Sequence, residues 1–345
     1  MNVLLTCAGR RNYLVGYFRE ALGGGGSIYA ADASPDAPAL HEADRAFLVP
    51  PLDHPRYLET LLDICQEHRV HLLLSLMDLE LPLLAEHQER FRQVGTVPVI
   101  SSPDVVGTCR DKWRTFRFLS SRGIGCPKTY RSLAQARDAL DAGEISLPLV
   151  VKPRWGTASL CVSRAETRDQ LPLAYEHVSA QLAHTIIGSV GAEHTGERVL
   201  IQECLQGAEH GLDVVNDLEG NHVCTLARRK LSMRNGETER ATTVSDERLH
   251  EVGRRIGEGL GHVFMLDCDV FVTGEDVFVL ELNPRFGGGY PFSHVAGADL
   301  PRALLAWADS RSPDPSWLRV RPNITSAKCD RLVVTSDSVV DSKTG

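Results

Sequence analysis

The sequence predicts a protein of mixed α/β and α+β architecture, and three observations support this assignment. Short apolar strands alternate with amphipathic helices over the first hundred residues, as in an open parallel sheet. Residues 211–228 and 269–281 then show pairs of strand-like runs separated by turn residues, which is typical of antiparallel hairpins. The chain has 345 residues, 43% of them hydrophobic, which suffices for two or three domains with ordinary cores.

The first part of the chain has the pattern of a βαβ unit. Residues 2–6 predict a strand, residues 14–22 a helix and residues 28–31 a second strand. Arg10 and Arg11 occupy the turn where a dinucleotide-binding fingerprint requires a second glycine, so an NAD dehydrogenase is only a weaker alternative. The two arginines are either a grip for an anionic substrate or a plain pair at the start of a helix.

Acidic residues follow the predicted parallel strands. Asp32 ends the second strand, and a helix over 56–68 and a strand over 71–76 precede Asp78 and Glu80. Because ligands bind at the carboxyl edge of open α/β sheets, we expect these three acids to line a pocket. Capping of the next helix is the alternative role, most of all for Asp78.

The region around Glu281 carries the strongest chemical signal. Residues 277–280 predict a buried strand, and Glu281 and Asn283, two residues apart, project from one face of it. Pro284 ends the strand because it cannot donate to a sheet. Arg285 then precedes a run of three glycines, where the backbone can approach a ligand closely.

The preceding strand supplies a partner for Glu281. If residues 274–276 form a three-residue turn, Asp269 lies directly opposite Glu281. Like charges in this position destabilise a sheet, unless both carboxylates hold a cation, with Asn283 adding a neutral oxygen. We therefore predict a magnesium site. Chance acids at a solvated strand end are the alternative, but they explain neither the Asn-Pro-Arg sequence nor the glycines.

With matches further up the chain, the Glu-x-Asn-x-Arg run from Glu281 to Arg285 resembles the ATP-grasp superfamily, over roughly residues 1–307. The sequence is most similar to the branch with carbamoyl phosphate synthetase, biotin carboxylase and the pyrrolysine-pathway ligase. This implies an N-terminal Rossmann-like pre-ATP-grasp domain followed by a two-subdomain ATP-grasp fold. The expected boundaries are 1–103 for the first domain, 104–198 for the subdomain with a phosphate-covering loop, 199–309 for the subdomain with the metal site, and 310–345 for a C-terminal extension with a disordered end.

The resemblance also implies residues that bind the phosphates of ATP. Lys112, on a helix expected over 105–119, and Lys152, at the end of a strand, would neutralise them. Ser159 belongs to the loop that would cover the phosphates, although Gly156 is the one glycine left there. For Lys112, a solvated position on the surface of its helix is the alternative.

The strand over 199–205 resembles the hinge that encloses adenine in this superfamily. The resemblance implies contacts with the adenine edge from Glu203, Cys204 and Leu205, and a position near the ribose for Glu209. An ordinary edge strand with acids facing water is the alternative.

The implied function is that of an ATP-dependent carboxylate–amine ligase that forms an amide through an acyl phosphate and releases ADP and phosphate. The cofactors would be ATP and Mg²⁺, with Mn²⁺ able to substitute, and Arg285 and Lys152 would be catalytic. The substrates would be a small-molecule carboxylate and amine, the best fit being an amino acid or small peptide. A bicarbonate-activating carboxylase or carbamoyl-phosphate-type enzyme and a catalytically inactive nucleotide-binding module are the alternatives.

The substrate pocket is expected between the first domain and two later stretches, residues 232–240 and 290–294. Its predicted residues are Arg10, Arg11, Asp78, Glu80, Arg240 and Tyr290. Residues 232–243 are polar without a core pattern, so we expect a mobile loop over the active site.

Composition argues against several other classes of protein. A net charge of −8 gives no basic surface for nucleic acid, and no run of 18 apolar residues predicts a membrane span. Nine cysteines without a C-x-x-C pair suggest neither zinc nor a redox dithiol. The opening residues lack the pattern of a secretory signal, so a cytoplasmic location is expected. The oligomeric state is open, although homodimers are common in the branch that the sequence resembles.

Overall fold

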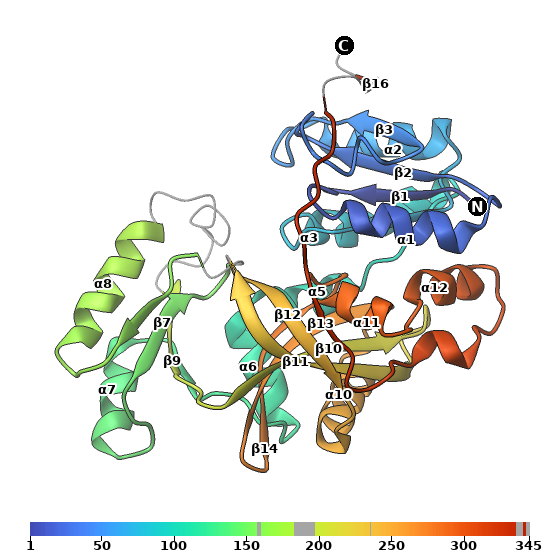
Figure 1. Cartoon of the computed structure of the whole chain (residues 1–345). Coiled ribbons are helices and arrows are strands. Elements are labelled where there is room, and N and C mark those ends of the chain that lie inside the picture. The colour runs from blue at the N-terminus through green and yellow to red at the C-terminus, as the bar shows by residue number, and fades with distance from the viewer. Residues whose placement is uncertain (157–159, 183–196, 235, 336–340, 343–345) are drawn as a thin grey trace.

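The computed structural model describes residues 1–156, 160–182, 197–234, 236–335 and 341–342. Within these residues the chain forms three β-sheets, two of six strands and one of four (Figure 1). No helix in this part of the chain is long and apolar enough to cross a membrane.

The N-terminal sheet is parallel and has the order β16-β3-β2-β1-β4-β5. Helices cover both of its faces, as expected for strands with buried residues throughout. The elements are β1 (Val3–Thr6), α1 (Asn12–Leu22), β2 (Ile28–Asp32), β3 (Arg45–Leu48), α2 (Tyr57–Glu67), β4 (Leu72–Ser75), α3 (Leu81–Glu86), α4 (Gln88–Gln93) and β5 (Val97–Pro98).

The four-stranded sheet has the order β6-β9-β7-β8 and antiparallel pairing throughout. Apolar residues of α7 and α8 pack against it and form a separate small core. Figure 1 shows both helices beside this sheet, at the left of the molecule. The elements are β6 (Thr129–Tyr130), α7 (Leu133–Asp141), β7 (Leu149–Pro153), β8 (Ser163–Ala165), α8 (Gln170–Leu182) and β9 (Val199–Glu203).

The second six-stranded sheet is antiparallel, with the order β14-β13-β10-β11-β12-β15. Helices α5, α6 and α10 share a core with it, whereas α11 and α12 share a core with α1 and the N-terminal sheet. The elements are α5 (Pro103–Arg110), α6 (Lys112–Ser121), β10 (Ala208–Asn216), β11 (His222–Arg234), β12 (Glu237–Val244), α10 (Glu247–Leu260), β13 (Met265–Thr273), β14 (Asp276–Asn283), α11 (Tyr290–Val295), α12 (Leu300–Ala308), the 3₁₀ helix η1 (Pro315–Leu318) and β15 (Thr325–Ala327).

The mixed α/β and α+β fold class is therefore as predicted, but two local expectations were wrong. The helix expected over 105–119 is two helices, because the Asp111 side chain accepts hydrogen bonds from the backbone N–H groups of Trp113 and Arg114 and starts α6. Residues 232–243 are not a loop: apart from 235, which lies outside the described residues, and Gly236, they belong to β11 and β12. A polar strand without an apolar face gives no period-2 signal, which is why the sequence suggested a loop.

The C-terminal segment connects the two six-stranded sheets. After β15 has paired with β12, the chain runs toward the N-terminal domain, where β16 (Asp341–Ser342) lies beside β3 (Figure 1, red). On the way Lys328 Nζ lies 2.9 Å from Glu237 Oε2, and Arg331 forms an ion pair with Glu42. The prediction of a disordered end, residues 335–345, falls mostly on 336–340 and 343–345, outside the described residues.

Candidate active site

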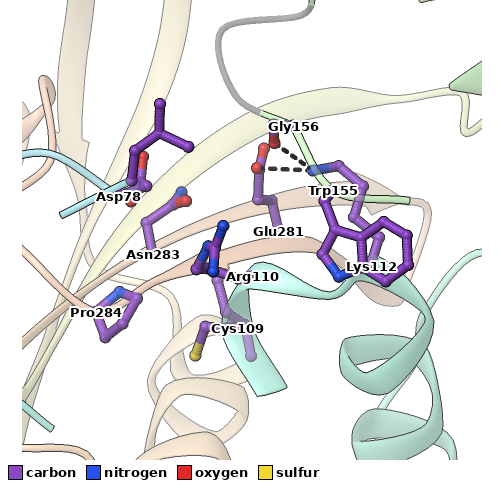
Figure 2. A pocket seen from close by; sticks show the side chains of 11 residues that line it. Asp78, Cys109, Arg110, Lys112, Trp155, Gly156, Glu281, Asn283 and Pro284 are labelled. Carbon is purple, nitrogen blue, oxygen red and sulfur yellow. Dashed lines mark hydrogen bonds and ion pairs between the residues drawn. The ribbon is translucent and has the colours of Figure 1, made fainter. Parts of the chain in front are cut away.

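Two adjoining cavities lie where the three sheets meet. The first, here the Lys112 cavity, is drawn in Figure 2; the second, the Arg285 cavity, has a volume of about 340 Å³. Asp78, Leu79, Glu281 and Asn283 line both. The carboxyl edge of the N-terminal sheet therefore meets the end of β14.

Asp269 and Glu281 are paired residues of β13 and β14, as predicted. The turn between the strands has two residues rather than three, because Thr273 pairs with Asp276. A bulge after Asp269, at which Leu280 has no partner, restores the register. The carboxylates therefore lie on one face of the sheet next to each other.

Lysine ammonium groups contact both carboxylates. Lys230 Nζ lies 2.7 Å from Asp269 Oδ1, and Lys112 Nζ lies 3.3 Å from Glu281 Oε1 (Figure 2). Burial raises the pKa of Asp269 to about 6, although Lys230 opposes this shift. The pair therefore lies where positive charge is favoured.

The predicted metal ligands are two carboxylates and one amide, Asp269, Glu281 and Asn283. In the described part of the chain, no group of three or more His, Cys, Asp or Glu side chains is arranged to hold a metal by itself. Oxygen donors of this kind nevertheless suit a hard cation such as Mg²⁺, which retains several other oxygen ligands. The three oxygen donors therefore fit the predicted Mg²⁺ ion, and the ammonium groups of Lys112 and Lys230 lie beside two of them.

Arg285 follows β14 and lies in the Arg285 cavity with only 9% of its side chain exposed. Its Nη2 lies 2.6 Å from Asp78 Oδ2, and its Nη1 lies 3.9 Å from Asp267 Oδ2. Burial alone would lower the pKa of Arg285, but Asp78 and Asp267 raise it overall. The guanidinium is therefore permanently charged, and Asp78 fixes its orientation.

Lys112 lines the Lys112 cavity, whereas Lys152 lines neither cavity but lies close enough to Lys112 and Glu281 for their charges to act on it. Lys112 is the first residue of α6, and its Nζ donates to the Gly156 carbonyl, 2.8 Å away (Figure 2). Lys152, on β7, is 6% exposed. Burial, and secondarily the charge of Lys112, lower the pKa of Lys152 to about 7.

The glycine run after Arg285 makes room for side chains of the protein itself. A Cβ at Gly289 would lie 2.1 Å from Arg228 Nη2, and a Cβ at Gly287 would lie 2.1 Å from Asp267 Oδ1. Arg228 is 1% exposed and forms ion pairs with Asp213, at 2.8 Å, and Asp267, at 3.2 Å. Gly288 and Gly289 also line the Arg285 cavity, so the close approach of a ligand to these glycines stays a prediction.

Two of the six predicted substrate residues line the Arg285 cavity, namely Arg11 and Asp78. Glu80 does not, because it is fully buried and accepts hydrogen bonds from the hydroxyls of Thr6, Tyr57 and Ser75. These contacts make Glu80 part of the interior of the N-terminal domain.

Three further predicted substrate residues lie away from both cavities. The Arg10 side chain is 87% exposed and lies 3.9 Å from Asp330. Arg240 is exposed on β12. Tyr290 is buried in the core, where its hydroxyl accepts from the Leu300 backbone N–H. Sequence alone could not separate these surface and core positions from contact positions.

The predicted nucleotide residues lie along the connection from the four-stranded sheet to the second six-stranded sheet. Glu203 ends β9, and its Oε2 accepts from the Lys128 backbone N–H at 3.2 Å. Cys204 and Leu205 follow in the link to β10, where Glu209 Oε1 lies 2.6 Å from Lys230 Nζ. Ser159 lies outside the described residues. Contacts of this group with a nucleotide stay predictions.

Five charged cavity residues were missed at the sequence level: Arg110, Arg228, Lys230, Glu237 and Asp267. Asp267 lies two residues before Asp269, so strand periodicity places it on the same face. Arg228 and Lys230 alternate in the same way on β11. Following these two strands at period 2 would have found three of the five.

Two family models match the chain. Residues 3–100 match the model described as PylC-like, N-terminal domain, and residues 195–329 match the model described as ATP-grasp in the biosynthetic pathway with Ter operon. The chain belongs to the ATP-grasp superfamily. The resemblance expected from Glu281 to Arg285 is thereby confirmed.

Known ATP-grasp relatives and similar structures differ in what their names say they act on. Formate-dependent phosphoribosylglycinamide formyltransferase of Salmonella schwarzengrund (strain CVM19633) is 24% identical over 267 residues. That match covers 75% of this chain and 63% of the relative, so this chain spans less than two thirds of the relative's length.

Solved structures with the same ATP-grasp fold include two that cover nearly the whole chain. The biotin carboxylase domain of Hydrogenobacter thermophilus 2-oxoglutarate carboxylase, in complex with MgADP, ADP and bicarbonate, has a TM-score of 0.73 at 16% identity, over 94% of this chain and 73% of that one. The L-amino acid ligase from Bacillus licheniformis has a TM-score of 0.70 at 19% identity, over 94% of this chain and 79% of that one.

Proposed function

We propose that this ATP-grasp chain is an ATP-dependent, ADP-forming ligase that joins a carboxylate to an amine, with an amino acid or small peptide among its substrates. The observation that carries the proposal is that oxygen donors and cations from separate elements of the chain lie together at one pair of adjoining cavities. They are Asp269 and Glu281 in register, Lys112 and Lys152 beside them, and Arg285 beyond.

Asp269, Glu281 and Asn283 would hold Mg²⁺, which when bound neutralises charge on the phosphates of ATP. Lys112 and Lys152 would place positive charge at the phosphate oxygens. The link from Glu203 to Leu205 would bind adenine and Glu209 the ribose, and Ser159 would cover the phosphates.

The remaining chemistry requires mainly positioning and electrostatic stabilisation. A carboxylate oxygen of the substrate attacks the γ-phosphorus, and ADP leaves with the electrons of the broken P–O bond. The amine nitrogen then attacks the acyl carbon, loses a proton and expels phosphate, which leaves an amide. Arg285, fixed by Asp78 beside the shared wall of the two cavities, would stabilise the negative charge that develops on the transferred group.

Two of the similar structures support this class of reaction. One similar structure is named as an L-amino acid ligase, and another holds MgADP together with bicarbonate. Bicarbonate activation is therefore the second candidate. A bicarbonate-activating enzyme would also use ATP, so the two candidates are distinguished by the acid that each one activates.

The experiment is an assay of ADP formation by the full chain with ATP and Mg²⁺, to which acids and amines are added singly and in pairs. The acids are the twenty common amino acids, formate and bicarbonate. The proposal expects ADP formation that requires both a carboxylate and an amine, with an amide product seen by mass spectrometry. ADP formation that responds to bicarbonate alone would establish the second candidate, and no ADP under any condition would contradict both.

A further inference from the structure

One cation in the Arg285 cavity differs from the others in its surroundings. Arg228, Lys230 and Arg285 each lie within 4 Å of at least one carboxylate. Arg11, which lines the same cavity, has no carboxylate within that distance in the described part of the chain. Its guanidinium donates instead to a backbone carbonyl, that of Phe286, at 2.5 Å.

Arg11 and Arg285 lie next to each other. Arg285 Nη1 donates to the same Phe286 oxygen at 3.0 Å, so the two guanidinium groups meet at one acceptor. The Nε of Arg285 is buried and has no hydrogen-bond partner among the described residues. Two like charges this close repel each other, and burial together with the charge of Arg285 lowers the pKa of Arg11. An anion placed between them would relieve this repulsion.

Glu237 lines the same cavity from β12. It lies against the glycine run, since a Cβ at Gly288 would be 3.5 Å from its carboxylate. Its ion-pair partner is Lys328 of the C-terminal segment, at 2.9 Å, and 61% of its side chain is exposed. An ammonium group entering the cavity can reach this carboxylate without breaking a buried contact.

We infer that Arg11 and Arg285 bind the carboxylate of the acid substrate and that Glu237 binds an ammonium group of the same molecule. The acid is then an amino acid or a short peptide with a free amino group, rather than formate, bicarbonate or a simple carboxylic acid. A carboxylate has the two acceptor oxygens that such a pair of guanidinium groups requires. The inference rests on the proposed ligase function for the identity of the reacting group, but the binding itself can be tested without catalysis.

The binding test is thermal unfolding of the full chain in the presence of each of the twenty common L-amino acids. The amide and the des-amino acid of every stabilising member are tested beside it. We expect at least one amino acid to raise the Tm, and its amide and des-amino forms to be much weaker. Arg11→Gln should lower the affinity about tenfold to a hundredfold. Arg11→Lys should restore part of this affinity, because lysine keeps the positive charge but lacks the paired N–H donors of the guanidinium.

Arg10→Gln is the matched control, since Arg10 is the neighbouring arginine and its side chain is 87% exposed. It should bind amino acids as the wild-type chain does. Glu237→Gln should remove the preference for the amino acid over its des-amino form, whereas Glu239→Gln on the same strand should keep it. ATP affinity, measured separately, should be unchanged in Arg11→Gln.

The outcomes separate this inference from the proposed function. Wild-type affinity in Arg11→Gln, equal loss in Arg10→Gln, equal binding of des-amino acids, or no stabilising amino acid at all would each overturn the inference. Binding that follows the expected pattern without any ADP formation would support the site and contradict the ligase function. ADP formation with an acid whose KM is unaffected by Arg11→Gln would support the ligase function and overturn the site.

Discussion

Asp269 and Glu281 face each other across β13 and β14 although the turn that joins these strands is one residue shorter than the sequence suggests. The bulge at Leu280 compensates for the missing turn residue. The pairing of the two acids therefore depends on this bulge, since a two-residue turn without it would place Leu280 opposite Asp269.

Glu281→Gln should reduce ADP formation by about a hundredfold or more, because it removes one charged oxygen ligand at the phosphates. The Mg²⁺ concentration for half-maximal rate should rise in the same variant. Glu275→Gln is the matched control, since that side chain, at the tip of the same hairpin, is 96% exposed. A turnover number in Glu281→Gln equal to the wild-type value would remove Glu281 from the metal site.

The affinity for ATP should fall as the pH rises through about 7. Lys152 loses its proton in this range, because burial and Lys112 lower its pKa to about 7. Lys152→Arg should show a flatter profile, since a guanidinium stays charged. Titration of ATP binding between pH 6 and pH 9 checks this, with both proteins in the same buffers.

The same shift has a consequence for stability. A lysine with a lowered pKa in the folded chain contributes stability above its unfolded pKa of 10.5, and this contribution is lost as the pH falls toward 7. Lys152→Met should therefore raise the free energy of unfolding at pH 7 while it weakens ATP binding. Urea unfolding at pH 7 measures the first effect, and a lower midpoint in the variant would contradict the assignment.

Glu80→Gln should make the chain more stable at pH 8 but not at pH 4. Burial raises the pKa of Glu80, so its contribution to stability is present below the unfolded value of 4.5 and is lost as the pH rises through the folded one. Glutamine removes that dependence and keeps partners for the surrounding hydroxyls. Glu86→Gln, at the exposed end of α3, is the control. A difference in the free energy of unfolding between wild type and Glu80→Gln that is the same at all pH values would show that the pKa of Glu80 is not raised in the folded chain.

Gly289→Ala should destabilise the chain by about 1–3 kcal/mol, as expected for overpacking against a rigid group. The added methyl would meet Arg228, which is held by Asp213 and Asp267 and cannot move without breaking a buried ion pair. Gly16→Ala in α1, where a Cβ meets nothing within 4 Å, should instead stabilise by about 1 kcal/mol. Equal Tm values for the two variants would show that the Arg228 side chain moves to make room for the methyl group.

The sequence was most informative where local chemistry determines the structure. The alternation in the first hundred residues gave the parallel sheet. The pairing of Asp269 with Glu281 was predicted correctly although the turn length used for it was wrong, because the bulge at Leu280 compensates for the shorter turn. It was least informative where a residue's role depends on distant contacts. Buried Glu80 accepts hydrogen bonds from three hydroxyls that belong to separate elements. Arg10 is exposed, whereas the adjacent Arg11 lines the Arg285 cavity. One sequence does not contain those contacts.

The C-terminal segment also bears on how the molecule is assembled during translation. Arg331 contacts Glu42, from which it is separated by 289 positions in the sequence. Because domains fold as units, N-terminal first, the parallel sheet can form while most of the protein is still being synthesised. The contact of Arg331 with Glu42 and the addition of β15 to the sheet that carries Asp269 are late events. A chain that stops before Thr325 would therefore contain all three predicted metal ligands, but the edge of β12 that pairs with β15 would be unpaired.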